Sequence, residues 1–177
     1  ARVDAAKLGT YEGLAGPEWK GRLCLRTSTK VYNQSLVATM IAALGEQKTE
    51  QLVRGWVANL ATDVFANDTQ LLEAIAAGQC DVGIVNTYYF GRIVKDRADF
   101  PVKLFWANQG AGGTHVNISG AGVTQHTRQA AAATRFLEWL SAGPAQAHFA
   151  AVNMEFPANP AATIDPLVQS WGAFEPS

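Results

Sequence analysis

Twice along this chain, a short apolar run ends at a polar corner and is followed by apolar residues at helical spacing. The first run covers residues 22–26 and the second covers residues 81–85. The second run is apolar at nearly every position, which is typical of a strand covered on both faces. A strand, a corner and a helix, repeated in this order, predict parallel strands in one sheet. We therefore expect an α/β fold with helices flanking the sheet.

Tyrosines follow both corners. Tyr32 lies just beyond the first corner, and the adjacent pair Tyr88 and Tyr89 follows the second, where Asn86 can cap the next helix. Carboxyl ends of parallel strands share one edge of a sheet, and α/β proteins bind ligands there. Phenolate is a hard anionic donor of the kind that ferric iron prefers, and helix N-termini favour its charge. The pattern predicts a metal site, with half-buried aromatic packing as the commoner alternative.

The balance of charge excludes several classes of partner. The chain has 14 Lys and Arg residues against 15 Asp and Glu residues, and neither sign forms a block. Nucleic acid and anionic lipid require a basic patch, so neither is an expected partner. The alanine-rich stretch from Ala130 is interrupted by Arg135 and Glu138, well before the roughly 20 apolar residues that a membrane span needs. We expect no membrane insertion.

No sequence pattern specifies an enzyme. His115, His126 and His148 are too scattered for a zinc pair. The glycine-rich residues 110–113 and 120–122 fit neither the dinucleotide fingerprint nor the P-loop. The serines lack the context of a nucleophile elbow. The sequence therefore favours binding over catalysis.

Cys24 and Cys80 each lie at a strand-like run. Neighbouring strands of one sheet could bring them together as a disulfide, and two buried thiols are the alternative. Neither cysteine has a second cysteine or a histidine at metal-binding spacing, so a metal site at the sulfurs is not expected.

Apolar periodicity predicts further helices. One covers residues 52–60, and another starts at the cap Asn67 and ends at Gly78. The remaining expected elements are a strand at 102–106, an extended crossover at 114–123, helices over 128–142 and from Pro144, and a short helix at 166–171.

Four segments together resemble the periplasmic ferric-iron-binding proteins of ABC transporters, in the class that binds iron with a Tyr-Tyr pair. In order and spacing, the segments cover nearly the whole chain. They are residues 10–22 with Tyr-Glu-Gly-Leu-Ala, 24–36 with Val-Tyr-Asn-Gln-Ser-Leu, 80–89 with Asn-Thr-Tyr-Tyr, and 115–123 with His-Val-Asn-Ile-Ser-Gly-Ala-Gly-Val. Each segment alone is a weak signal, and the set is specific.

The resemblance implies a type II periplasmic-binding-protein fold, with a mixed sheet flanked by helices in each of two lobes. In that family the lobes close on Fe(III) in the cleft between them. Tyr88 and Tyr89 match the paired ligands of the metal, and Tyr32 matches a further tyrosine near it. The resemblance therefore assigns all three phenols to one metal site.

Three polar residues near these tyrosines are the expected supporting residues. Asn86 matches a position near the metal or its anion, while Arg26 and Ser28 lie on the adjoining corner. The implied anion is a synergistic one such as carbonate. The implied role is capture of ferric iron in the periplasm and its delivery to the permease of an ABC transporter, without catalysis.

Members of this family are longer than this chain, which starts where their second lobe begins. Most of the first lobe is therefore expected to be absent, together with a further iron ligand. We expect residues 1–113 to form the second α/β lobe, and residues 154–177 to form an extended tail with a short helix. Residues 114–153 are expected to be a crossover strand and helices that normally pack on the absent lobe. Exposed apolar surface there favours self-association.

Two other functions stay open at this point. The chain could be a truncated interaction module, whose exposed face pairs with another chain or with a copy of itself. It could also bind an oxyanion without metal at the two helix N-termini, near the corner from Arg26 to Ser28.

Overall fold

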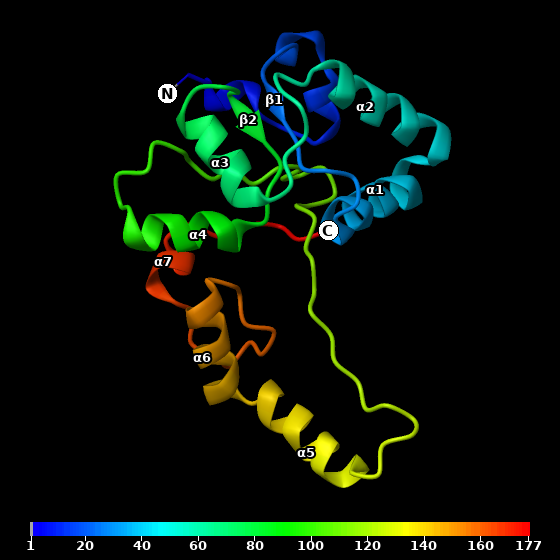
Figure 1. Ribbon diagram of the computed structural model, residues 1–177, viewed down its shortest axis with the longest axis vertical. Coiled ribbons are helices and arrows are strands. Elements are labelled where there is room, and N and C mark those ends of the chain that lie inside the picture. The colour runs from blue at the N-terminus through cyan, green and yellow to red at the C-terminus, as the bar shows by residue number, and fades with distance from the viewer. Residues whose placement is uncertain (1) are drawn as a thin grey trace. The chain divides into compact units, whose positions relative to one another are not determined.

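A computed structural model describes residues 2–177, which divide into two units. The first unit comprises the chain up to Asn117 together with Ala173–Ser177, and the second is Ile118–Gly172. Both strands belong to the first unit (Figure 1). All four tyrosines, residues 11, 32, 88 and 89, also fall within it. The expected boundaries at residues 113 and 153 concern packing on another lobe, and they stay a prediction.

The first strand, corner and helix form as predicted. β1 (Leu23–Cys24) leads through the corner into α1 (Val31–Leu44), and Tyr32 is the second residue of that helix. α1 ends at Gly45, whose φ of 84° is a conformation that favours glycine. The positive φ explains why the apolar pattern stops there and α2 (Glu46–Ala58) begins in a new direction.

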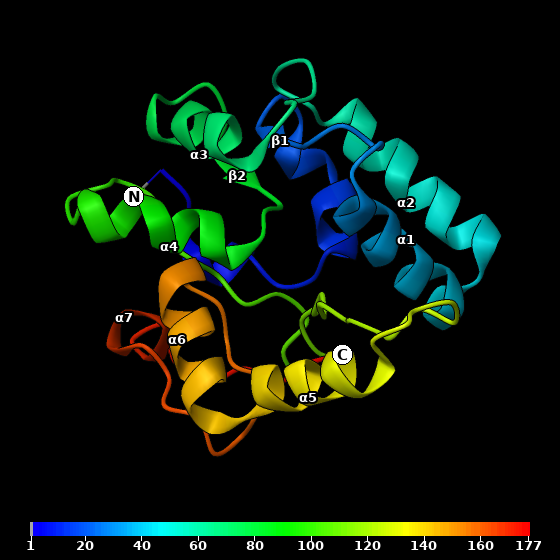
Figure 2. The same ribbon diagram turned by 60° about the horizontal axis from the view of Figure 1, so that its bottom comes forward.

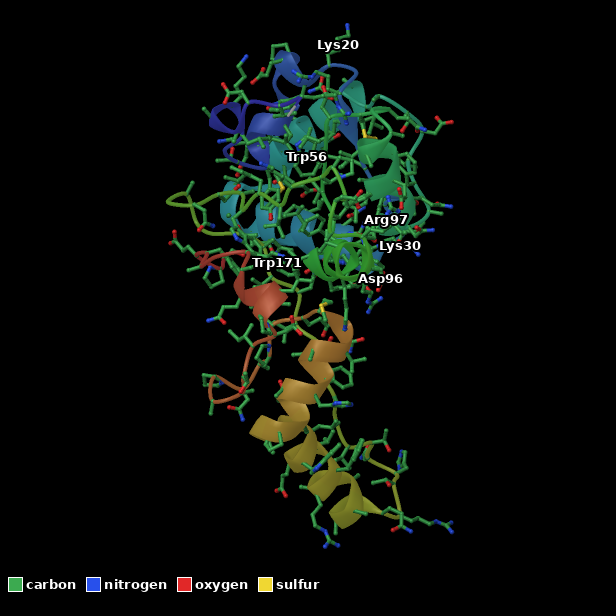
Figure 3. The ribbon with its side chains drawn as sticks, turned by 90° about the vertical axis from the view of Figure 1, so that its left-hand side faces the viewer. Lys20, Lys30, Trp56, Asp96, Arg97 and Trp171 are labelled. Atoms are coloured by element: carbon green, nitrogen blue, oxygen red, sulfur yellow. A yellow bond between two sulfur atoms is a disulfide. The ribbon has the colours of Figure 1, made fainter. Side chains whose placement is uncertain are left out.

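The main core lies between these helices and the N-terminal segment. Three short 3₁₀ helices, η1 (Ala5–Lys7), η2 (Glu12–Ala15) and η3 (Pro17–Trp19), precede β1. Trp56, labelled in Figure 3, packs from α2 into this core and donates its Nε1–H to the Tyr11 carbonyl at 2.9 Å. The buried members of the core are Leu14, Trp19, Leu23, Leu36, Met40 and Trp56.

The second corner follows the same plan. α3 (Asp68–Ala76) starts at Asn67, whose side chain accepts a hydrogen bond from the Gln70 N–H, as its cap pattern predicts. β2 (Val82–Gly83) then pairs in parallel with β1, and α4 (Thr87–Asp96) follows. α3 packs against β2 and α4, and both ribbon views show these elements together (Figures 1 and 2). The two tyrosine-bearing helices therefore start from neighbouring parallel strands.

The strands are shorter than the sequence predicts. The expected strand at residues 22–26 is reduced to a two-residue ladder, and single parallel bridges join Leu23 to Leu60 and Arg26 to Phe65. The strand predicted at 102–106 is wrong, because no strand forms there in the described chain. Trp106 instead stacks on Phe174 with ring centroids 4.1 Å apart. Side-chain packing of this kind, rather than a strand, accounts for the apolar character of residues 102–106.

Cys24 and Cys80 form a disulfide, with their Cα atoms 5.9 Å apart. This settles the choice that the sequence leaves open between a bridge and two thiols. The bridge joins β1 to the turn before β2 and belongs to a second buried cluster with Leu71, Ala74 and Ile75. The parallel pair is thus held by a covalent bond beside only two residues of ladder.

Gly83, in β2, leaves no room for a side chain beside α3. A Cβ atom at this position would lie 2.5 Å from Cδ2 of Leu71 and 3.1 Å from the Cys24 carbonyl. We expect Gly83→Ala to lower the free energy of unfolding by about 1–3 kcal/mol, because the core would be overpacked. Urea denaturation measures this change. The control is Gly9→Ala, since nothing lies within 4 Å of a Cβ at that position; equal losses in the two variants would contradict the packing argument.

The second unit contains α5 (Ala130–Ser141), α6 (Gly143–Asn153) and α7 (Pro166–Gln169), close to the helices expected from the sequence. None of the helices in residues 2–177 is both long and apolar enough to span a bilayer. Several large apolar side chains of this unit are exposed, including Trp139 at 60%. The others are Ile118, Val123, Phe136, Phe149, Val152 and Phe156.

Candidate metal centre

The three predicted tyrosines come together in the first unit. Tyr88 and Tyr89 open α4, and their ring centroids are 4.5 Å apart. Tyr32, from the first turn of α1, lies close enough to Tyr88 to raise the pKa of the Tyr88 hydroxyl, as does Tyr89. Parallel pairing of β1 and β2 explains this convergence, because it aligns the starts of the two following helices.

The Tyr88 hydroxyl lies at the centre of this group. Burial raises the pKa of Tyr88 well above the value of 10 for a free phenol, and the hydrogen bonds and negative charges of Tyr32 and Tyr89 raise it further. Tyr88 is therefore protonated at neutral pH. A highly charged metal can displace the proton of a phenol on binding, and the oxygens of three neighbouring phenols are suited to such a metal.

Two arginines lie over the tyrosine rings. The guanidinium carbon of Arg26 is 5.0 Å from the ring centroid of Tyr32. That of Arg92 is 5.2 Å from the Tyr88 ring and 5.7 Å from the Tyr89 ring. A cation at this distance attracts the face of the ring and favours the phenolate once it forms. Two guanidinium groups thus lie beside the three tyrosine rings.

Arg26 is buried and paired. Its Nη1 donates to Oδ2 of Asp68 at 2.7 Å, and its Nη2 donates to Oδ1 of Asn33 at 3.2 Å. Burial raises the pKa of Asp68, although the charge of Arg26 and the hydrogen bonds from Arg26 and the Asn86 N–H act in the opposite direction. Nε of Arg26 is buried without a hydrogen-bond partner in the described residues.

Asn86 orients its side chain toward Tyr88. Although it precedes α4, its side chain makes no helix-capping hydrogen bond, unlike the expectation from sequence. Its Nδ2 donates to the Tyr88 hydroxyl at 3.3 Å, while its Oδ1 accepts from Nδ2 of Asn117 at 3.0 Å. Asn117 thus fixes which end of the Asn86 amide faces the phenol. A donor in this position favours the ionised phenol over the neutral one.

Ser28 lies on the exposed part of the corner. Its carbonyl accepts a hydrogen bond from Nε2 of Gln34 at 3.1 Å, and no hydrogen bond described for it reaches a tyrosine.

The residues that sequence reasoning missed are Asp68, Asn33, Arg92 and Asn117. Asp68 follows a good cap residue and reads as an ordinary first-turn acid, so only its burial distinguishes it.

A metal site built from His, Cys, Asp and Glu side chains is not found in residues 2–177. No group of three or more His, Cys, Asp and Glu side chains there is arranged to hold a metal ion. A surface pocket of about 300 Å³ adjoins Tyr89. Its other lining residues are Thr69, Arg92, Ile93, Asp96 and Arg97. Figure 3 shows Asp96 and Arg97 near the end of α4.

The chain has the fold of type II periplasmic binding proteins, and it covers part of that fold. Residues 4–175 match the family of bacterial extracellular solute-binding proteins, and the chain belongs to this family. The family is one of solute binding rather than catalysis. The resemblance and the fold class inferred from sequence are thereby confirmed.

Individual relatives are iron proteins by name. The chain is 46% identical to iron uptake protein A2 from Synechocystis over an alignment of 179 positions, which covers 97% of this chain and 52% of that protein. It superposes on apo FutA2 from Synechocystis with a TM-score of 0.94 and 42% identity, covering 99% of this chain and 58% of that one. For a Trichodesmium protein in complex with iron and citrate ligands, the TM-score is 0.94 and the identity is 38%. That match covers 99% of this chain and 58% of the Trichodesmium chain. The chain thus spans about half the length of the curated relatives it matches.

Proposed function

We propose that this chain binds Fe(III) through the phenolate oxygens of Tyr32, Tyr88 and Tyr89. The observation that carries the proposal is the convergence of three phenols from two helices, with the rings of Tyr88 and Tyr89 4.5 Å apart and Tyr32 close enough to act on the pKa of Tyr88. Three phenolates supply three hard anionic donors, which balance the charge of the ferric ion. Relatives named for iron uptake and a neighbour solved with iron and citrate support the choice of metal.

Three phenolates leave part of the coordination sphere of iron open. Water or a small anion such as carbonate, or a ligand from a facing lobe, would complete it. In this proposal the site lies in the cleft of a two-lobed periplasmic binding protein, and the bound ion is passed to the permease of an ABC transporter. Protonation of the phenolates, or reduction of the metal, would release it.

The affinity of the site for Fe(III) should depend on pH. Because each phenol that binds iron must lose a proton, Fe(III) affinity should fall as the pH falls, by about tenfold per pH unit for each proton released. Because the pKa of Tyr88 is raised, the hydroxyl must give up its proton to iron at every neutral or acidic pH, so the loss of affinity extends over this whole range. The measurement is a titration of the 177-residue chain with ferric nitrilotriacetate, followed by visible phenolate-to-iron absorption and corrected for the protonation of the chelator.

The control is the same titration with Zn²⁺, which gives no charge-transfer colour. Iron affinity that does not change between acidic and neutral pH would rule out phenolate ligands, because no protons would then be displaced.

Oxyanion binding without metal is less well supported. Arg26, the cation expected to attract the anion, is already paired with the buried Asp68 carboxylate. Stabilisation of the iron-free chain by phosphate would favour this alternative. A role as an interaction module draws support from the exposed apolar side chains of α5 and α6. Concentration-dependent mass in solution, without iron uptake, would favour it.

A further inference from the structure

The segment from Thr114 to Asn117, called the crossover strap below, contacts both tyrosine-bearing corners. The chain enters the second unit directly after it, at Ile118. Thr114 is buried, donates its N–H to the Glu175 carbonyl at 2.7 Å and accepts the Ser177 N–H at its own carbonyl at 3.0 Å. The strap therefore has a fixed starting point within the first unit.

His115 attaches the strap to the helix that carries Tyr32. Its Nε2 lies 3.1 Å from Oγ of Ser35, and its Nδ1 lies 3.3 Å from Oγ1 of Thr39. Tyr32, Ser35 and Thr39 share one face of α1, because their spacing is that of successive helical turns. Burial lowers the pKa of His115, so the ring is neutral at neutral pH. A neutral imidazole donates from one nitrogen and accepts at the other, which satisfies both hydroxyls.

Asn117 attaches the strap to the second corner. Its Nδ2 donates to Oδ1 of Asn86 at 3.0 Å, and Nδ2 of Asn86 donates to the Tyr88 hydroxyl at 3.3 Å. His115 and Asn117 are only two positions apart in the chain, yet they contact different corners. The strap thus joins α1 to the residue that precedes α4.

This connection is separate from the one made at the strands. There, the corners are joined by the two-residue ladder and by Asp68, which accepts hydrogen bonds from Arg26 and from the Asn86 N–H. Two separate connections limit how far α1 and the start of α4 can shift relative to each other. A metal site loses affinity when its ligands are held less firmly, so both connections bear on the spacing of the phenols.

We propose that His115 and Asn117 are positioning residues, which set the spacing between Tyr32 and Tyr88 through the crossover strap. Each acts through a neighbour, on α1 or before α4, and neither touches the metal. The effect on iron rests on the proposed function, whereas the connection between the corners is a property of the iron-free chain.

The first test uses iron-free protein and follows the side-chain amide of Asn86 by ¹H–¹⁵N NMR. The signal is assigned by its loss in Asn86→Ala. In Asn117→Ala, the amide protons should exchange with water at least about threefold faster, because a hydrogen bond that holds the amide in place is lost. In His115→Ala the signal should also shift, although the hydrogen bonds described for the His115 side chain go to α1.

Asn159→Ala is the matched control for the amide. The Asn159 side chain also makes two hydrogen bonds, to Ser141 and Ala161, but it belongs to the second unit. The Asn86 signal should be the same in this variant as in the parent. An Asn86 signal that is unchanged in both Asn117→Ala and His115→Ala would overturn the proposal.

The second test measures Fe(III) affinity by competition against nitrilotriacetate. Asn117→Ala should lower the affinity by about tenfold, the low end of the range for a residue that supports a ligand. Because Asn117 acts through Asn86, the double variant Asn86→Ala/Asn117→Ala should bind iron no more weakly than Asn86→Ala. The urea midpoint of Asn117→Ala should stay close to that of the parent, since Asn117 is exposed. A loss of affinity without a loss of stability separates positioning from a purely structural role.

His115→Ala should lower the Fe(III) affinity by at least about threefold. Its control is His126→Ala, since His126 is exposed and belongs to the second unit; this variant should bind iron like the parent. Losses from Asn86→Ala and Asn117→Ala that multiply in the double variant, or parent affinity in both Asn117→Ala and His115→Ala, would overturn the proposal. Failure of the parent to bind iron would instead refute the proposed function and leave the amide comparison valid.

Discussion

Tyr88→Phe should lower the Fe(III) affinity of this chain by more than about 100-fold and remove most of its visible absorption. Loss of a group that only supports a ligand typically costs 10–100-fold in metal affinity, so loss of a ligand at the centre of the site should cost more. The Tyr88 hydroxyl accepts a hydrogen bond from Asn86, and both Tyr32 and Tyr89 are close enough to raise its pKa. Competition against nitrilotriacetate at fixed pH measures the change.

Tyr11→Phe is the matched control for this variant. Tyr11 is the fourth tyrosine of the chain, and burial likewise raises its pKa, but its hydroxyl accepts the backbone N–H of His115 at 3.3 Å. Its loss should leave the colour and the affinity unchanged. Equal affinities for Tyr88→Phe and the parent would contradict the assignment of Tyr88 as a ligand.

Removal of the disulfide should have the largest effect on stability. The bridge between Cys24 and Cys80 spans 56 residues of sequence, and closing a loop of this length stabilises a fold by about 4 kcal/mol in the chain-entropy view. Because the β1–β2 ladder has only two residues per strand, little else fixes the register of these strands. We expect the double variant Cys24→Ala/Cys80→Ala to lose about this much free energy of unfolding, measured by urea denaturation.

Dithiothreitol provides the control for this effect. It should destabilise the parent and leave the double alanine variant unchanged. A parent whose urea midpoint is the same in oxidising and reducing buffer would show that the bridge contributes nothing to stability.

Much of the scaffold could be predicted because local signals agree with the fold. Gly45 ends α1 with a positive φ, and Asn67 caps α3, as their residue types indicate. The alignment of the tyrosines followed from parallel pairing of the strands that precede them. These features depend on neighbours in sequence or on one general rule of sheet topology.

The supporting residues could not be predicted, because their roles depend on contacts between distant segments. Asp68 is distinguished by burial against Arg26, 42 residues away in sequence. Asn86 looks like a helix cap, yet its side chain is engaged by Asn117 and Tyr88. The sequence could not decide whether Cys24 and Cys80 form a disulfide, for the same reason. The two residues are brought together by the register of β1 and β2, which local patterns do not show.

The resonance Raman spectrum of the iron-loaded chain tests the central claim most directly, with excitation in the visible band. Phenolate coordination predicts enhanced ring modes of tyrosinate, which weaken in Tyr88→Phe and Tyr89→Phe and keep their intensity in Tyr11→Phe. A chain that carries ferric iron without tyrosinate modes, or with the same modes in all three variants, would contradict a metal site built from Tyr32, Tyr88 and Tyr89.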